Sequence, residues 1–176
     1  MQGILETLQD PHARHAMLVH FPIVLALVGI VPLIIHLAMK ARSRGLGLAL
    51  VAWYAAASIG AALAANSGEA AEEGVEALSL TPAEQAALER HEELGENGWI
   101  WPLIPAAFAA ATLVPRPRLR IAAGGLAIAA GAGVAVWVGA TAHAGGELVY
   151  KHGLGVPARG AAPITVPRTQ TDDDED

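Results

Sequence analysis

The chain has 176 residues, of which 53% are hydrophobic and only 16% charged, and its mean hydropathy is +0.41. Soluble globular proteins carry about 25% charged residues, so this composition indicates a chain surrounded mostly by lipid. The absence of cysteine excludes disulfides, thiolate metal sites, iron–sulfur clusters and covalently attached c-type haem. The net charge of −6 argues against a nucleic-acid partner, because phosphate backbones are bound by basic clusters.

Four apolar segments are candidates for membrane-spanning helices, which need roughly 17–25 residues to cross a bilayer. The predicted spans cover residues 17–39, 46–65, 99–114 and 121–142, and none of them contains Lys, Arg, Asp or Glu. The third is the shortest and needs helical residues from the preceding loop to complete it. We therefore expect an all-α membrane protein, with a four-transmembrane-helix bundle in residues 1–156.

Basic residues in two short turns predict the orientation of the bundle. The turns after the first and third spans hold six of the 11 Lys and Arg residues and no acid: Lys40, Arg42, Arg44, Arg116, Arg118 and Arg120. Short basic loops stay in the cytoplasm, so we expect both termini on the periplasmic side of a bacterial cytoplasmic (inner) membrane. The loop 66–98, with nine glutamates and one arginine, fits the outer side. No basic cluster precedes the first span, which is expected to be an uncleaved anchor.

Two segments outside the predicted spans have clear local patterns. Thr81-Pro82-Ala83-Glu84 predicts the start of a helix that runs to about Leu94, with Thr81 as N-cap and Pro82 at the first helical position. Residues 157–176 contain several prolines and end in five consecutive acids, so they are predicted to be a disordered, solubilising tail.

Small residues recur every fourth position in the second and fourth predicted spans: Ala52, Ala56, Gly60 and Ala64, then Ala127, Gly131, Ala135 and Gly139. Such grooves let helices approach closely in lipid, so they predict either a compact antiparallel bundle or the face of a homo-oligomer. Pro22 and Pro32 are expected to bend the first span. Large aromatic residues are interpreted as interfacial anchors: Trp53, Tyr54, Trp99, Trp101 and Trp137.

The histidines are unevenly placed along this topology. Six of the seven lie at or near the outer ends of spans: His12, His15, His20, His91, His143 and His152. An ionisable side chain within a span, as His20 is, indicates function by default. His36 lies toward the cytoplasm without a histidine partner and is interpreted as structural. Without cysteine, such imidazoles suit haem iron, zinc, copper or nickel, and no hydrolase or nucleotide-binding motif occurs.

Two stretches resemble a known family. HAMLVHFPIVL (residues 15–25) resembles the opening motif HPxLVHFPIAL, and GGELVYKHGLGV (residues 145–156) resembles the closing motif GGxLVYxHGxGV, of the predicted bacterial membrane proteins grouped as domain of unknown function 2231. The resemblance covers about residues 12–156 and implies four spans in a redox setting, since some members are fused to Rieske or cytochrome c domains. It places His15, His20, His91 and His152 at family histidine positions, whereas Ala16 stands where the family has proline.

Three functions remain open. The leading hypothesis is a b-type cytochrome-like protein, an electron carrier or complex subunit rather than a stand-alone enzyme, that binds haem b near the outer surface and exchanges electrons with a periplasmic cytochrome or Rieske protein. Its preferred axial pair is His20 and His91, with His15, His152 and His143 as the other candidates. The second hypothesis is a copper or zinc site on His15, His20, His91 and His152 with nearby glutamates. The third is a cofactor-free structural subunit of a membrane redox complex.

Overall fold

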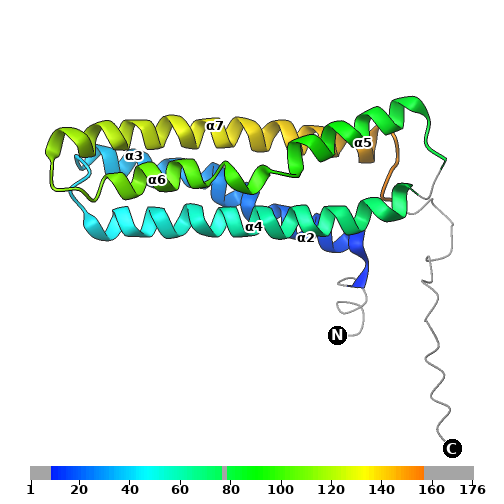
Figure 1. Ribbon diagram of the computed structural model, residues 1–176, viewed down its shortest axis with the longest axis horizontal. Coiled ribbons are helices and arrows are strands. Elements are labelled where there is room, and N and C mark those ends of the chain that lie inside the picture. The colour runs from blue at the N-terminus through cyan, green and yellow to red at the C-terminus, as the bar shows by residue number, and fades with distance from the viewer. Residues whose placement is uncertain (1–8, 77–78, 157–176) are drawn as a thin grey trace, which may run out of the picture.

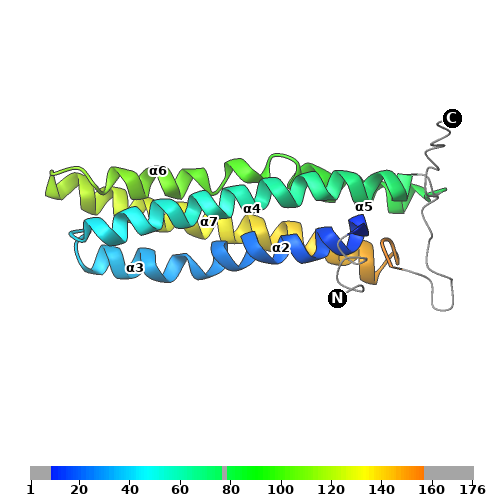
Figure 2. The same ribbon diagram turned by 90° about the horizontal axis from the view of Figure 1, so that it is seen from below.

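The computed structural model describes residues 9–76 and 79–156, and every regular element within those ranges is a helix. In chain order these are α2 (Pro11–Val28), α3 (Ile30–Ala38), α4 (Arg44–Glu76), α5 (Pro82–Gly95), the 3-10 turn η1 (Gly98–Ile100), α6 (Leu103–Ala111) and α7 (Pro117–Tyr150). They lie side by side as a bundle of four rods, made of α2 with α3, of α4, of α5 with η1 and α6, and of α7 (Figures 1 and 2). The predicted acidic tail, 157–176, lies outside the described residues.

The prediction of an all-α membrane protein is confirmed. Within the described ranges, three helical segments are long and apolar enough to cross a bilayer: Pro11–Ala38, Arg44–Val75 and Pro117–Tyr150. The segment predicted as the third span, 99–114, instead contains η1 and the nine-residue α6, separated by a turn. This rod lies between α4 and α7, so it completes the bundle, but a count of four spans stays a prediction.

Two helices extend well beyond the apolar runs that predicted them. The second predicted span ended near Ala65, whereas α4 continues to Glu76, and α7 covers Pro117–Tyr150 rather than 121–142. The first third of the predicted outer loop, residues 66–76, is therefore helical. The helix predicted from Thr81 is confirmed as α5, which begins with a reciprocal capping box: Glu84 accepts from the Thr81 backbone N–H at 2.7 Å, and the Thr81 hydroxyl accepts from the Glu84 backbone N–H at 3.4 Å.

The first rod continues as helix through Pro22 and is interrupted at Gly29, where α2 ends and α3 begins, while a bend at Pro22 or Pro32 stays a prediction. Pro32 follows three residues later, lacks an N–H, and its ring crowds the carbonyl of Val28 one turn earlier. Near the break, the Leu25 carbonyl accepts both the backbone N–H of Gly29 at 3.0 Å and the indole N–H of Trp53 at 2.8 Å. The second rod thus supplies a donor where the first rod is irregular.

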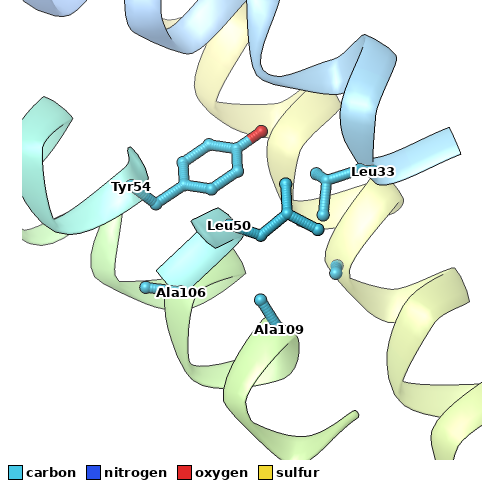
Figure 3. Packing of buried hydrophobic residues seen from close by; sticks show 6 residues of the cluster. Leu33, Leu50, Tyr54, Ala106 and Ala109 are labelled. Atoms are coloured by element: carbon cyan, nitrogen blue, oxygen red, sulfur yellow. The ribbon is translucent and has the colours of Figure 1, made fainter. Parts of the chain in front are cut away.

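The core lies where α3, α4, α6 and α7 meet. Its buried residues are Leu33, Leu50, Tyr54, Ala106, Ala109 and Ala127, and Figure 3 shows the Tyr54 ring reaching across this cluster. Tyr54 is completely buried, so its interpretation as an interfacial anchor is wrong. The indoles of Trp53 and Trp137 donate to the carbonyls of Leu25 and Leu94, whereas Trp99 and Trp101 are exposed as an anchor requires.

Large apolar side chains cover the outside of the bundle. Val136, Ile59 and Leu48 are among the most exposed, with 74%, 63% and 57% of their surface accessible. In water such a continuous apolar surface promotes aggregation, whereas in a bilayer it contacts acyl chains. The burial pattern therefore agrees with the composition, because large apolar side chains face outward, where lipid would contact them, and small residues lie at the contacts between helices.

The predicted small-residue groove of α7 is used within the chain at Gly131. A Cβ there would lie 2.9 Å from the Tyr54 hydroxyl oxygen and 3.1 Å from Leu33 Cδ1.

We expect Gly131→Leu to lower the free energy of unfolding by about 1–3 kcal/mol, because the added side chain forces the rods apart. Thermal unfolding in detergent measures this. Gly139→Leu is the matched control, since Gly139 is exposed and a Cβ there would meet no atom of another described segment within 4 Å. Equal effects at both positions would contradict this packing.

Candidate functional site

The ends of α2, α4, α5 and α7 that lie away from the two basic turns are at the same end of the bundle (Figure 1), and several of them carry histidines. His12 and His15 lie one turn apart on α2, and His91 lies on α5. The rings of His15 and His91 contact edge to face, with centroids 6.3 Å apart and planes at 88°. Two imidazoles that are 76 positions apart in the sequence (91 − 15) are therefore neighbours at one end of the bundle.

The ring of His15 is held in one tautomer by α4. Its Nδ1 lies 2.9 Å from the carbonyl oxygen of Ala64 and 3.2 Å from the hydroxyl of Ser67, which itself donates to the Ala64 carbonyl at 2.8 Å. A carbonyl oxygen only accepts, so Nδ1 carries the proton and donates it. Nε2 is then left with its lone pair, which is the arrangement in which a histidine binds a metal.

His91 is partly buried, and its Nδ1 atom is shielded from solvent without a hydrogen-bond partner among the described residues. Burial lowers the pKa of His91, and the neighbouring His15 lowers it further, while the backbone of Thr141 offsets part of the effect. His91 is accordingly neutral near pH 7, with a nitrogen lone pair available to a ligand.

Glycines on the facing helices make room for each ring. A Cβ on Gly68 of α4 would lie 3.1 Å from His15 Cε1, and one on Gly145 of α7 would lie 2.9 Å from His91 Cε1. His12 is placed in a similar way, since a Cβ on Gly155 would lie 3.1 Å from its Cδ2. The Nε2 atom of His12 is also buried without a described partner. Three rings are thus packed against backbone, and two of them, His12 and His91, keep a buried nitrogen without a hydrogen-bond partner among the described residues.

The other histidines predicted for the site lie elsewhere. His20 is exposed on α2, where its Nδ1 is 2.6 Å from the carbonyl of Ala16 in its own helix. His143 is exposed on α7. His152, just beyond α7, lies near Glu84, whose pKa is lowered by hydrogen bonds from Thr81 and, to a smaller degree, by His152. The structure therefore pairs His91 with His15, and the preferred pairing with His20 has no geometric support.

His36 lies near the opposite end, as its interpretation as a structural residue requires. It is buried, and its Nε2 is 3.0 Å from the Thr112 hydroxyl, which donates to the carbonyl of Ala109 at 2.6 Å. Within residues 9–76 and 79–156, no group of three or more His, Asp or Glu side chains is close enough to hold a metal ion. The site is therefore a pair of imidazoles with a third, His12, one helical turn away.

Two residues of the site, His12 and Ser67, were not among the site residues predicted from the sequence. His12 could have been found, because its spacing of three from His15 puts both on one helix face. Ser67 could not, since a serine in a polar helix extension carries no indication that it faces a histidine. One ion pair joins two helices near the site, since Glu147 of α7 lies 3.7 Å from Arg90 of α5. Lys151, at the end of α7, lies 3.5 Å from the same carboxylate.

The lowered pKa of His91 predicts a pH dependence of stability. The unfolded imidazole has a pKa of about 6.5, so below that value the unfolded chain binds a proton more readily than the folded one. Stability is therefore complete above about pH 6.5 and is lost as the pH falls through this window toward the lowered pKa of the folded state. In cofactor-free protein, His91→Gln should reduce the fall in melting temperature between about pH 7.5 and 5.5. The exposed His143→Gln should retain the wild-type fall, and an unchanged fall in His91→Gln would contradict the burial argument.

Comparison with known proteins gives a family but no described function. No curated protein and no solved structure matches the chain. A family model described as "Predicted membrane protein (DUF2231)" matches residues 11–158, which include every described helix and all the histidines discussed above. The chain belongs to this family of predicted membrane proteins, as its motifs around His15 and His152 indicated.

Proposed function

We propose that this membrane protein binds haem b at the histidine end of the bundle, with His15 and His91 as the axial pair, and takes part in electron transfer. The observation that carries the proposal is the fixed tautomer of His15, whose Nδ1 donates to the Ala64 carbonyl and whose Nε2 lone pair is free beside the neutral ring of His91. A haem without covalent attachment is retained through its axial ligands and its pocket, and imidazole is a common ligand.

The pair also suits haem because its two histidines lie on different helices, His15 on α2 and His91 on α5, which can move apart. The rings contact edge to face, so a porphyrin enters only when α5 moves away from α2. None of the residues of α5 is buried, so little apolar packing opposes this movement. The glycine-backed faces of both rings provide backbone walls without side chains to displace. Haem edges near the end of a bundle lie within reach of a soluble carrier, such as a periplasmic cytochrome or Rieske protein.

A transition-metal ion such as copper or zinc is the second candidate, favoured by one specific observation. His12 Nε2 and His91 Nδ1 are both buried without described partners, and His15 lies between them along the site. Three imidazoles are a common ligand set for zinc and copper. As the rings stand they are too far apart to share one ion, so binding requires them to turn. A cofactor-free subunit of a redox complex remains the third candidate.

Visible spectroscopy and metal analysis of purified protein test the proposal. We expect dithionite-reduced protein, supplied with haem during expression, to show sharp b-type bands. His15→Ala and His91→Ala should each weaken haem retention by more than the 10–100-fold typical of losing an outer-shell partner. His20→Ala and His143→Ala are matched controls with exposed side chains and should keep the wild-type spectrum. A colourless protein that holds copper or zinc would support the second candidate, and one that holds neither would support the third.

We further propose that the two basic turns face the cytoplasm and the histidine end faces the periplasm of a bacterial inner membrane. Both turns lie at the same end of the bundle (Figure 2), as the positive-inside rule requires.

A reporter enzyme active only in the periplasm should be active when fused after residue 160 and silent when fused at Arg44. The reverse pattern would place the histidines in the cytoplasm and remove the periplasmic electron carrier from the proposal, while leaving the haem assignment to the spectra.

A further inference from the structure

The end of the bundle opposite the histidines contains a cavity of about 460 Å³ between its two turns. Its walls come from the turn between α3 and α4, which supplies Arg42 and Arg44, and from residues 112–115 after α6. Arg120, in the first turn of α7, completes the lining. Three arginines from two separate parts of the chain therefore line one space.

The positive charge around this cavity is not neutralised within the described part of the chain. None of Arg42, Arg44 and Arg120 forms an ion pair there, and the Nε atom of Arg120 is buried without a hydrogen-bond partner. The acidic residues of the described ranges all lie toward the histidine end, on α5, on the outer parts of α4 and α7, or at Asp10. Guanidinium stays charged at any physiological pH, so the three groups repel one another until an anion enters.

The directions of the helices add to the positive electrostatic potential at this cavity. Both long helices begin at this end, α4 at Arg44 and α7 at Pro117, so their positive N-terminal dipoles lie beside the cavity. Among the described residues no side chain caps the first turn of α7, so the backbone N–H groups that follow Pro117 have no side-chain acceptor there. A shielded guanidinium N–H and two further arginines thus line one cavity, beside the N-terminal dipoles of two helices.

We infer that this cavity binds the phosphate group of an anionic ligand, and that the ligand is the headgroup of an anionic phospholipid. Arginine forks match the oxygens of phosphate, and basic pockets at the cytoplasmic ends of membrane helices suit such headgroups. The neighbouring surface is apolar, because Met39, Leu119 and Ile121 expose nearly half of their surface each. A headgroup in the cavity can therefore leave its acyl chains against residues that already face lipid.

Binding of short-chain phosphatidylglycerol to the detergent-solubilised full chain, followed by native mass spectrometry and thermal unfolding, tests this inference. We expect saturable binding that raises the melting temperature, with phosphatidylcholine giving no such shift. Arg42→Gln and Arg120→Gln should each weaken the apparent affinity about tenfold, the size of one lost charge-assisted hydrogen bond. Arg14→Gln, which removes the same charge at the histidine end, is the matched control and should bind as wild type does.

A second measurement replaces the lipid by inorganic phosphate and again follows the melting temperature. A shift produced by the lipid and not by phosphate identifies a lipid headgroup as the ligand. A shift produced equally by phosphate and lost in Arg120→Gln supports the anion site but assigns it to a small soluble phosphate. The inference is overturned if phosphatidylglycerol gives no shift, or if the shift is the same in wild type, Arg42→Gln and Arg120→Gln. Because Arg42 is an exposed residue of a turn, its variant keeps the test valid should Arg120→Gln fail to fold.

Discussion

The packing of Tyr54 between two glycines is the constraint on which the rest of this bundle depends. A Cβ on Gly29 of the first rod or on Gly131 of α7 would lie 2.9 Å from the tyrosine hydroxyl oxygen. In lipid no hydrophobic force draws helices together, so contact rests on close approach of this kind. Because Tyr54 belongs to α4, it fixes the axial register of three rods at once. That register sets Gly68 against His15 at one end and Gly47 against His36 at the other.

The same long helices separate two kinds of chemistry by the full length of the bundle. At one end, α4 presents the Ala64 carbonyl and Ser67 to His15, in company with most of the acidic residues. At the other, the first turns of α4 and α7 carry arginines that no described acid neutralises. Neutral imidazoles suit a soft or borderline metal, whereas fixed guanidinium groups suit phosphate. The two ends therefore differ in ligand preference because they differ in which groups keep their charge.

Sequence reasoning predicted what hydropathy and capping specify, and it missed what depends on packing. Uninterrupted apolar runs gave the helices, and Thr81 with Glu84 gave α5, because both patterns are local. The polar extension of α4 to Glu76 has no hydropathy pattern, and the burial of Tyr54 depends on glycines in other rods. His20 and His15 are five residues apart, about 140° around a helix, so only one of them can face α4. Which of the two histidines faces α4 follows from the axial register of α2 against α4, and a single sequence does not contain that information.

Helix α5 links the proposed site to the stability of its surroundings. It has no buried residue, and it is held to α7 by the Trp137–Leu94 hydrogen bond of 2.9 Å, the Arg90–Glu147 ion pair and the contact of His91 with Gly145. A ligand shared by His15 and His91 joins α5 to α2, which the apolar core does not do. Binding and the docking of α5 are then one equilibrium, and the apparent affinity is reduced by the fraction of molecules whose rings are not aligned. In the proposed site, the weak packing of α5 that would admit a large cofactor would thus also limit how tightly it is held.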